Sequence, residues 1–157
     1  MRLGGILAVV LVSLSGAALA AEIKIPPTAV KPDPRRATYK LPADLKWKLE
    51  SLGQWQAPLF GDPSKPGPYG VLIKWLPGTM SQPHYHTTDR WAYVVQGTWW
   101  VSTSDHYDPK TTWPLPVGSF ATDLAGKVHW DGAKDETVIL EIVGMGPADT
   151  VKVPEKK

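Results

Sequence analysis

The sequence predicts an all-β domain, built as an antiparallel sandwich or barrel. Short runs rich in β-branched and aromatic residues recur between glycine and proline turns. After residue 20 there is no long segment with the 3.6-residue hydrophobic period of a helix. The runs that we interpret as strands are residues 71–76, 90–95, 98–103, 119–124 and 137–143.

The first twenty residues have the pattern of a secretory signal peptide. Arg2 gives a positive start, residues 6–14 are mostly apolar, and residues 18–20 form a small-x-small cleavage site. The apolar stretch is shorter than the ~20 residues that a membrane-spanning helix needs. We therefore expect export to a periplasm or the cell exterior, with no membrane segment left after cleavage. A retained N-terminal anchor is the alternative.

The segment after the cleavage site begins with an arm rich in proline. Residues 21–42 carry five prolines, which rules out a regular helix or a central strand there. From Leu45 to Glu50 apolar and charged residues alternate, which predicts a half-buried strand more strongly than a short helix. Residues 61–68 have the composition of a loop. We expect one domain over residues 43–153.

Composition limits the chemistry that the chain can perform. The formal net charge is only +2 and no basic stripe stands out, which argues against nucleic-acid binding. Cysteine is absent, so disulfides and thiolate ligands are excluded. Any metal must be held by histidine, carboxylate, amide or water.

Three of the four histidines fall in two frames bounded by glycine. Residues 78–97 hold His84 and His86, whose spacing places both imidazoles on the same face of a strand. Residues 118–129 end in His129, which would come from a distant strand. Imidazole suits zinc, copper, iron and nickel, so a metal site is the leading interpretation. The alternative is that these histidines are core or surface residues that hold no metal.

The two frames resemble the two conserved motifs of the cupin superfamily. The resemblance covers roughly residues 45–150 and rests on Gly78, His84, His86, Gly97, Gly118, Gly126 and His129, all in register. It implies a double-stranded β-helix, the jelly-roll barrel, in a single domain. It also implies a metal ion held at the motif histidines and a homodimer.

The chain departs from these motifs at three positions. Arg90 stands where most cupins have a metal-binding glutamate, and a guanidinium cannot ligate a metal. Leu124 and Ala133 replace the usual proline and asparagine. The resemblance therefore implies a three-histidine site of His84, His86 and His129.

Two further residues are candidates for a catalytic role. Arg90 has the same strand parity as His84 and His86, so it is expected to point toward the site. It would contact an anion or an oxygen species, or else form a buried ion pair with a carboxylate such as Asp89, Asp105 or Glu141. Gln82 shares this parity and could offer its amide oxygen as a fourth ligand.

Two other polar residues have a weaker claim on the site. Asp89 could replace the missing glutamate only if a bulge turned its side chain inward. His106 is expected to be a solvated loop residue.

Tryptophan is the outlier of the composition, with eight residues. Trp75, Trp91 and one of Trp99 and Trp100 are expected to fill the core or a subunit interface. Trp99 and Trp100 cannot both be core residues, because adjacent strand residues face opposite sides. Aromatic side chains near loops, at Trp55, Trp113 and Trp130, could provide platforms for a carbohydrate.

These observations predict an exported metal-dependent oxidoreductase. Copper is the first expectation for the ion, iron the second, with zinc or manganese behind, and the oxidant would be oxygen or peroxide. Oxidative cleavage of a carbohydrate or polysaccharide is one version of the reaction. A dioxygenase that acts on a small aromatic or diketone substrate is the other. The alternatives are a periplasmic binding protein for a metal or small molecule and a non-redox enzyme that uses the ion as a Lewis acid.

Overall fold

The computed structural model describes residues 25–154. The predicted signal peptide, residues 1–20, lies outside this range, so export stays a prediction. The chain divides into two units with their boundary between Thr38 and Tyr39. Residues 25–38 contain turns but no helix or strand. No helix within residues 25–154 is long and apolar enough to cross a membrane.

The second unit is built almost entirely from strands. Two short 3-10 helices, η1 (Pro42–Asp44) and η2 (Pro109–Thr111), are the only helical turns among the described residues. The strands are β1 (Lys48–Leu49), β2 (Trp55–Phe60), β3 (Gly67–Trp75), β4 (His84–His86), β5 (Arg90–Gln96), β6 (Trp99–Ser102), β7 (Trp113–Leu115), β8 (Phe120–Asp123), β9 (Trp130–Gly132), β10 (Val138–Gly146) and β11 (Thr150–Lys152).

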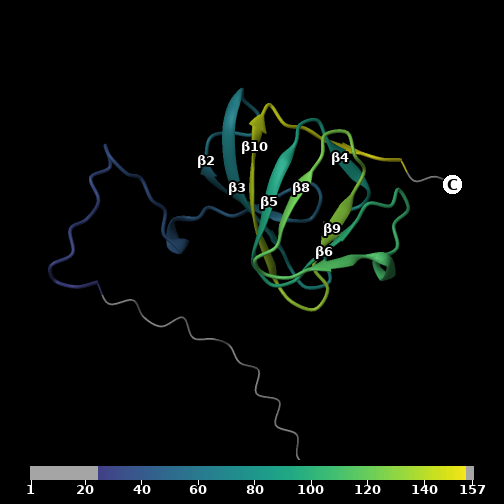
Figure 1. The fold of residues 1–157 in the computed structure, drawn as a ribbon, viewed down its shortest axis with the longest axis horizontal. Helices are drawn as coiled ribbons and strands as arrows, with labels where there is room; N and C mark the ends of the chain where they lie inside the picture. Colours follow the sequence, from purple (N-terminus) through teal and green to yellow (C-terminus); the bar gives the residue numbers. More distant parts are fainter. Residues whose placement is uncertain (1–24, 155–157) are drawn as a thin grey trace, which may run out of the picture. The chain divides into compact units, whose positions relative to one another are not determined.

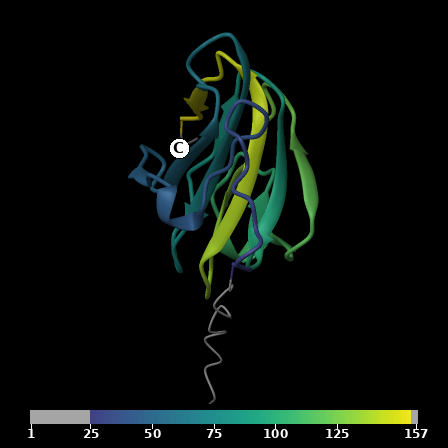
Figure 2. The same cartoon turned by 90° about the vertical axis from the view of Figure 1, so that its left-hand side faces the viewer.

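The strands form one large sheet and two small ones, and all the pairings are antiparallel. The large sheet has the order β1-β2-β3-β10-β5-β8, with β10 in its middle (Figures 1 and 2). The small sheets have the orders β11-β4 and β7-β6-β9. In Figure 1 strands β4, β6 and β9 group on one side of the domain, away from β2, β3 and β10. The prediction of an all-β domain is confirmed.

The core follows the two-residue period of the strands. Alternate residues of β3, β5 and β10 are buried, and Trp99 of β6 packs into the same cluster. Two sheets therefore contribute to one apolar interior, as expected for sheets packed face to face. The cluster comprises Tyr69, Val71, Ile73, Trp75, Ala92, Val94, Trp99, Ala133, Val138, Leu140 and Ile142.

The prediction for residues 45–50 was wrong in extent. Only Lys48 and Leu49 form a strand there, and Leu49 is 56% exposed. The segment lies at the edge of the large sheet between η1 and a turn at residues 51–53, so the alternation does not reflect burial against the core. Trp47 is instead half-buried beside Lys74, whose Nζ lies 4.2 Å from the ring centroid.

The tryptophans adjacent in sequence face opposite sides of their strand, as predicted. Trp99 is 2% exposed, whereas Trp100 is half-buried with Lys134 Nζ 3.7 Å from its ring centroid. Trp75 is buried in the core, but Trp91 is 40% exposed on the outer side of β5. The homodimer, for which Trp91 was a candidate contact, stays a prediction.

Candidate functional site

The fold brings the three motif histidines together from two parts of the chain. His84 and His86 begin and end β4, and both point inward and are buried. His129 pairs with His84 through two backbone hydrogen bonds, each 2.9 Å long, in which each N–H donates to the other's carbonyl. Strand β4 is thus joined directly to the segment that leads into β9.

A glycine turn fixes the approach of His129. Gly126 has a φ of 68°, in the left-handed region that favours glycine. Its N–H donates to the carbonyl of His86 over 2.8 Å. Gly126 was recognised in the sequence as part of the second motif, and it ties the loop before His129 to the end of β4.

The three imidazoles form a compact and enclosed cluster. One ring nitrogen from each lies within 4.8 Å of the others, which is close enough to hold a metal ion. The ring centroids are 4.5–5.2 Å apart. His84, His86 and His129 are only 1%, 2% and 5% exposed. The sequence prediction therefore named residues that the fold does bring together.

Each imidazole is oriented through its Nδ1 atom. His84 Nδ1 donates to the carbonyl of Gln82 at 2.9 Å, and His129 Nδ1 donates to the carbonyl of Lys127 at 3.1 Å. His86 Nδ1 lies 3.1 Å from the hydroxyl of Thr150, on strand β11, which pairs with β4. A carbonyl can only accept, so in the neutral form of His84 and of His129 the proton is on Nδ1 and the lone pair is on Nε2. This arrangement is typical of metal-binding histidines.

The free nitrogens fit a metal ion. Nε2 of His86 and of His129 are buried and have no hydrogen-bond partner within the described part of the chain. Burial lowers the pKa of His84, although the nearby Asp131 carboxylate opposes this effect. Burial, with the positive charge of Arg90 and the neighbouring imidazoles, lowers the pKa of His86 to about 2. Neutral imidazoles with buried lone pairs are the form in which histidine binds metals.

Arg90 points inward and forms an ion pair, but with a residue that sequence reasoning missed. Its Nη2 donates to Asp123 Oδ2 at 2.7 Å, and the two side chains are 19% and 8% exposed. The residues are partners across β5 and β8. The same carboxylate oxygen lies 3.7 Å from His129 Nε2. Asp123 thus places a negative charge beside the three histidines.

The carboxylates that were expected to pair with Arg90 were the wrong ones, because the register of β5 with β8 is not readable from sequence. Asp89 is exposed and does not turn inward. Its Oδ1 accepts a 2.7 Å hydrogen bond from the N–H of Ala125 and so supports the loop before His129. A carboxylate inside the second frame, just before Leu124, was the signal that could have pointed to Asp123.

Gln82 is not placed where a fourth ligand would be. It is exposed, and its contact with His84 is made by its backbone carbonyl rather than by its amide. Pro83, which follows it, keeps Gln82 outside β4, so strand parity does not apply to it. His106 is exposed, as predicted.

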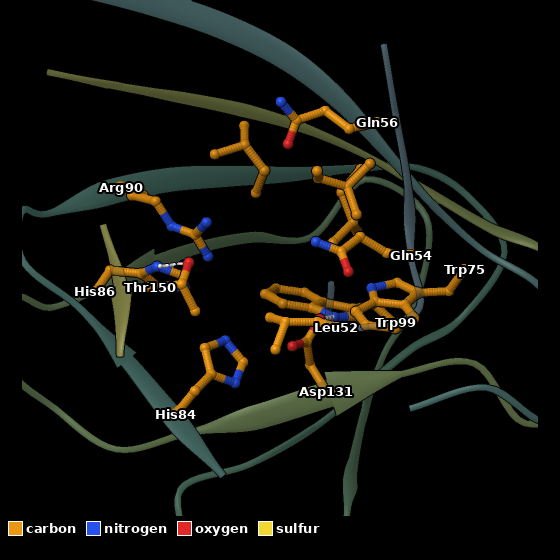
Figure 3. Close-up of a pocket in the computed structure, with 13 residues that line it drawn as sticks. Leu52, Gln54, Gln56, Trp75, His84, His86, Arg90, Trp99, Asp131 and Thr150 are labelled. Atoms are coloured by element: carbon orange, nitrogen blue, oxygen red, sulfur yellow. Dashed lines mark hydrogen bonds between the residues drawn. The ribbon is translucent and has the colours of Figure 1, made fainter. Parts of the chain in front are cut away.

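An inner cavity of about 70 Å³ lies against two of the histidines. Figure 3 shows the guanidinium of Arg90, the amide of Gln54 and the imidazole of His84 directed toward the same space. Sequence reasoning missed Gln54, which directly precedes β2, and Gln56 within β2, although both line this cavity. The lining residues are Leu52, Gln54, Gln56, Ile73, Trp75, His84, His86, Arg90, Trp99, Asp131, Leu140, Ile142 and Thr150.

A larger outer cavity of about 300 Å³ adjoins the inner one. Four residues line both cavities, namely Gln56, His86, Arg90 and Thr150. The outer cavity is otherwise lined by Glu50, Pro63, Tyr69, Val71 and Ala148. His86, Arg90 and Thr150 therefore lie where the two cavities meet.

Asp131 is held at the inner cavity by two side chains. Trp99 Nε1 donates to its Oδ2 at 2.7 Å, and the Ser81 hydroxyl donates to its Oδ1 at 3.2 Å. Both oxygens of this buried carboxylate are thus satisfied by donors.

We predict that Trp99→Phe lowers the free energy of unfolding by about 1.5–3 kcal/mol, because a charged acceptor loses its partner. Trp100→Phe, the matched control on the neighbouring residue, is expected to cost less than about 1 kcal/mol. Urea unfolding of both variants measures the difference. Equal losses would contradict the role given to the Trp99–Asp131 bond.

Comparisons with known proteins agree on the fold. The polyketide cyclase RemF from Streptomyces resistomycificus superposes with a TM-score of 0.65 at 16% identity, covering 77% of this chain and 88% of RemF. An RmlC-like cupin from Ralstonia eutropha JMP134 gives 0.56 at 20% identity, covering 73% and 72%. KdgF from Halomonas sp. gives 0.54 at 17% identity, covering 70% and 94%. No protein-family model and no curated protein sequence matches the chain.

The chain therefore has the cupin fold, and this fold carries a three-histidine group that could hold a metal ion. The identities are too low to transfer an activity from any of these structures.

Proposed function

We propose that the protein is a metal-dependent enzyme that acts on a small molecule. The observation that carries this proposal is the set of three buried imidazoles, each fixed through Nδ1. The Nε2 atoms of His86 and His129 are buried without a partner in the described chain, and His84 and His86 line a cavity. A purely structural histidine cluster has no reason to leave buried nitrogens without partners.

Within this proposal, His84, His86 and His129 would hold copper or iron, with zinc or manganese as alternatives. Such an ion, bound by three neutral ligands, supplies Lewis acidity and, if it is copper or iron, redox chemistry with oxygen or peroxide. An oxidoreductase is therefore our specific proposal for the reaction class. The support for a redox-active ion is the imidazole donor set, which suits copper and iron as well as zinc.

The chain's own residues would position the substrate and exclude water. Arg90 lines both cavities and is oriented by Asp123. Apolar residues of β3 and β10 close the inner end of the site. Because the three imidazoles are at most 5% exposed, charge interactions with them are screened less than those at the surface.

The dimensions favour a small substrate over a polysaccharide. The inner cavity measures about 70 Å³ and the outer about 300 Å³, at the lower end of the range for small-molecule pockets. The tryptophans that were considered as sugar platforms do not line the outer cavity, and Trp130 is fully buried. We therefore propose that the substrate is a small oxidisable molecule.

Elemental analysis of the purified chain, followed by oxygen and peroxide consumption assays, tests this function. Stoichiometric copper or iron that cycles between redox states and supports oxidant consumption is the expected result. Bound zinc with no consumption of either oxidant would sink the oxidoreductase and move the reaction to Lewis-acid chemistry. A chain that binds no metal would contradict the enzyme proposal and favour a binding module.

A further inference from the structure

Besides His86 Nε2, three buried polar atoms of residues that line the inner cavity have no hydrogen-bond partner among the described residues. They are Trp75 Nε1, Arg90 Nε and Gln54 Oε1. Trp75 is only 2% exposed. Leaving such groups unpaired costs free energy, so a ligand in this cavity gains affinity by pairing with them.

The chemistry of these atoms defines the ligand. Trp75 and Arg90 each offer an N–H, so they call for an acceptor oxygen on the ligand. Gln54 offers an acceptor oxygen, which calls for a hydroxyl or another donor. A ligand that carries both an acceptor oxygen and a hydroxyl close together satisfies all three.

The charges at the site favour an anionic acceptor. Arg90 is already neutralised by Asp123, and the Asp131 carboxylate is occupied by Trp99 and Ser81. A divalent cation on three neutral imidazoles then adds two positive charges, of which the Asp131 carboxylate, bonded only to neutral donors, offsets one. Glu50 is the acidic residue that lines the outer cavity, and Lys48 pairs with it at 3.2 Å.

The volume limits the size of the group that enters. A buried water, which is one heavy atom, needs roughly 10–15 Å³ of cavity volume. A cavity of about 70 Å³ therefore holds about five or six heavy atoms. A hydroxy-carboxylate head group has this size. Any remaining part of the substrate would lie in the outer cavity, against Tyr69, Val71 and Ala148.

We propose that the inner cavity binds the 2-hydroxy-carboxylate end of a small organic acid. Its carboxylate accepts hydrogen bonds from Arg90 Nε and Trp75 Nε1, and its hydroxyl donates to Gln54 Oε1. This inference rests on the proposed function, because the histidine-bound cation supplies the charge that makes an anion preferable to a neutral ligand.

The test is a calorimetric titration of the zinc-loaded protein with lactate and with lactamide. Lactamide has nearly the same shape and the same hydroxyl but carries no charge. Zinc is redox-silent, so binding is measured without turnover. We expect saturable lactate binding at least about tenfold tighter than lactamide binding. Absence of saturable lactate binding, or equal affinities, overturns the proposal.

Three variants test whether lactate binds through the residues of the inner cavity or only through contact of its carboxylate with the ion. Trp75→Phe removes one donor, and Arg90→Lys keeps the charge but removes the Nε–H. Each should weaken lactate binding about tenfold or more while zinc stays stoichiometric. Trp130→Phe is the matched control, since Trp130 Nε1 is also buried without a partner in the described chain but lies outside the cavity lining.

The outcomes distinguish this inference from the proposed function. Lactate affinity that is unchanged in both Trp75→Phe and Arg90→Lys, or reduced equally in Trp130→Phe, overturns the cavity assignment even if the metal chemistry is correct. Selective lactate binding with the expected losses supports the assignment even if no oxidant is ever consumed.

Discussion

His129→Ala is expected to abolish stoichiometric metal binding. The substitution removes one of three nitrogens that lie within 4.8 Å of one another. The fourth histidine, His106, is exposed and is not part of this cluster. Removing a residue that only orients a ligand typically costs ten- to hundredfold in metal affinity, so loss of the ligand itself should exceed about hundredfold. Competition with a chromophoric chelator measures this affinity.

Two further variants provide intermediate and unchanged metal affinities for comparison with His129→Ala. Thr150→Val keeps the shape of the side chain but removes the hydroxyl at His86 Nδ1, so it should weaken metal binding by roughly ten- to hundredfold. His106→Ala is the control and should leave the affinity unchanged. If His129→Ala bound metal as tightly as His106→Ala, the three histidines would not be the site.

Arg90→Met is expected to destabilise the protein by about 3 kcal/mol. The substitution leaves Asp123, which is 8% exposed, without its cation. Breaking a buried ion pair by removing one partner typically costs about 3–5 kcal/mol, and the partial exposure of Arg90 favours the low end of this range. Denaturant unfolding of the metal-free protein provides the measurement, because bound metal would add its own stabilisation.

The double variant Arg90→Met with Asp123→Leu tests whether the loss of stability comes from the unpaired charge of Asp123. An apolar pair of similar volume should recover most of the loss, since no charge is then left buried. The corresponding double-mutant cycle should show a coupling of at least about 1 kcal/mol. Strict additivity would contradict the ion pair, and loss of fold in both variants would show that packing around Arg90 matters more than its charge.

The sequence was sufficient to predict the histidine cluster, because two simple rules act there. Alternation along a strand puts His84 and His86 on one face, and the glycine-bounded frames place His129 in the second motif. Arg90 obeyed the same alternation, so its inward direction was also predictable. The register between strands was not predictable, since the pairing of β5 with β8 depends on contacts between residues 33 positions apart. Asp123 was missed for that reason.

The polar residues that line the cavity were not predictable from the sequence for a related reason. Gln54 and Gln56 alternate with Trp55 and Ala57, and in a single sequence the glutamines read as the solvent side. The structure places the glutamines inside and pairs Gln56 with the core residue Ile73. At residues 45–50 the same rule predicted too long a strand: Leu45 and Trp47 are half-buried, but only Lys48 and Leu49 pair with β2.

The deep placement of the histidines bears on how quickly a bound ion could exchange. The three imidazoles are at most 5% exposed, and the cavities that reach them meet at Gln56, His86, Arg90 and Thr150. An ion leaving by this route must lose its imidazole ligands one at a time and pass the Arg90–Asp123 ion pair. We therefore expect slow release, so that the ion bound when the chain folds is retained. The metal found in the protein would then reflect supply at the time of folding more than the equilibrium order of affinities.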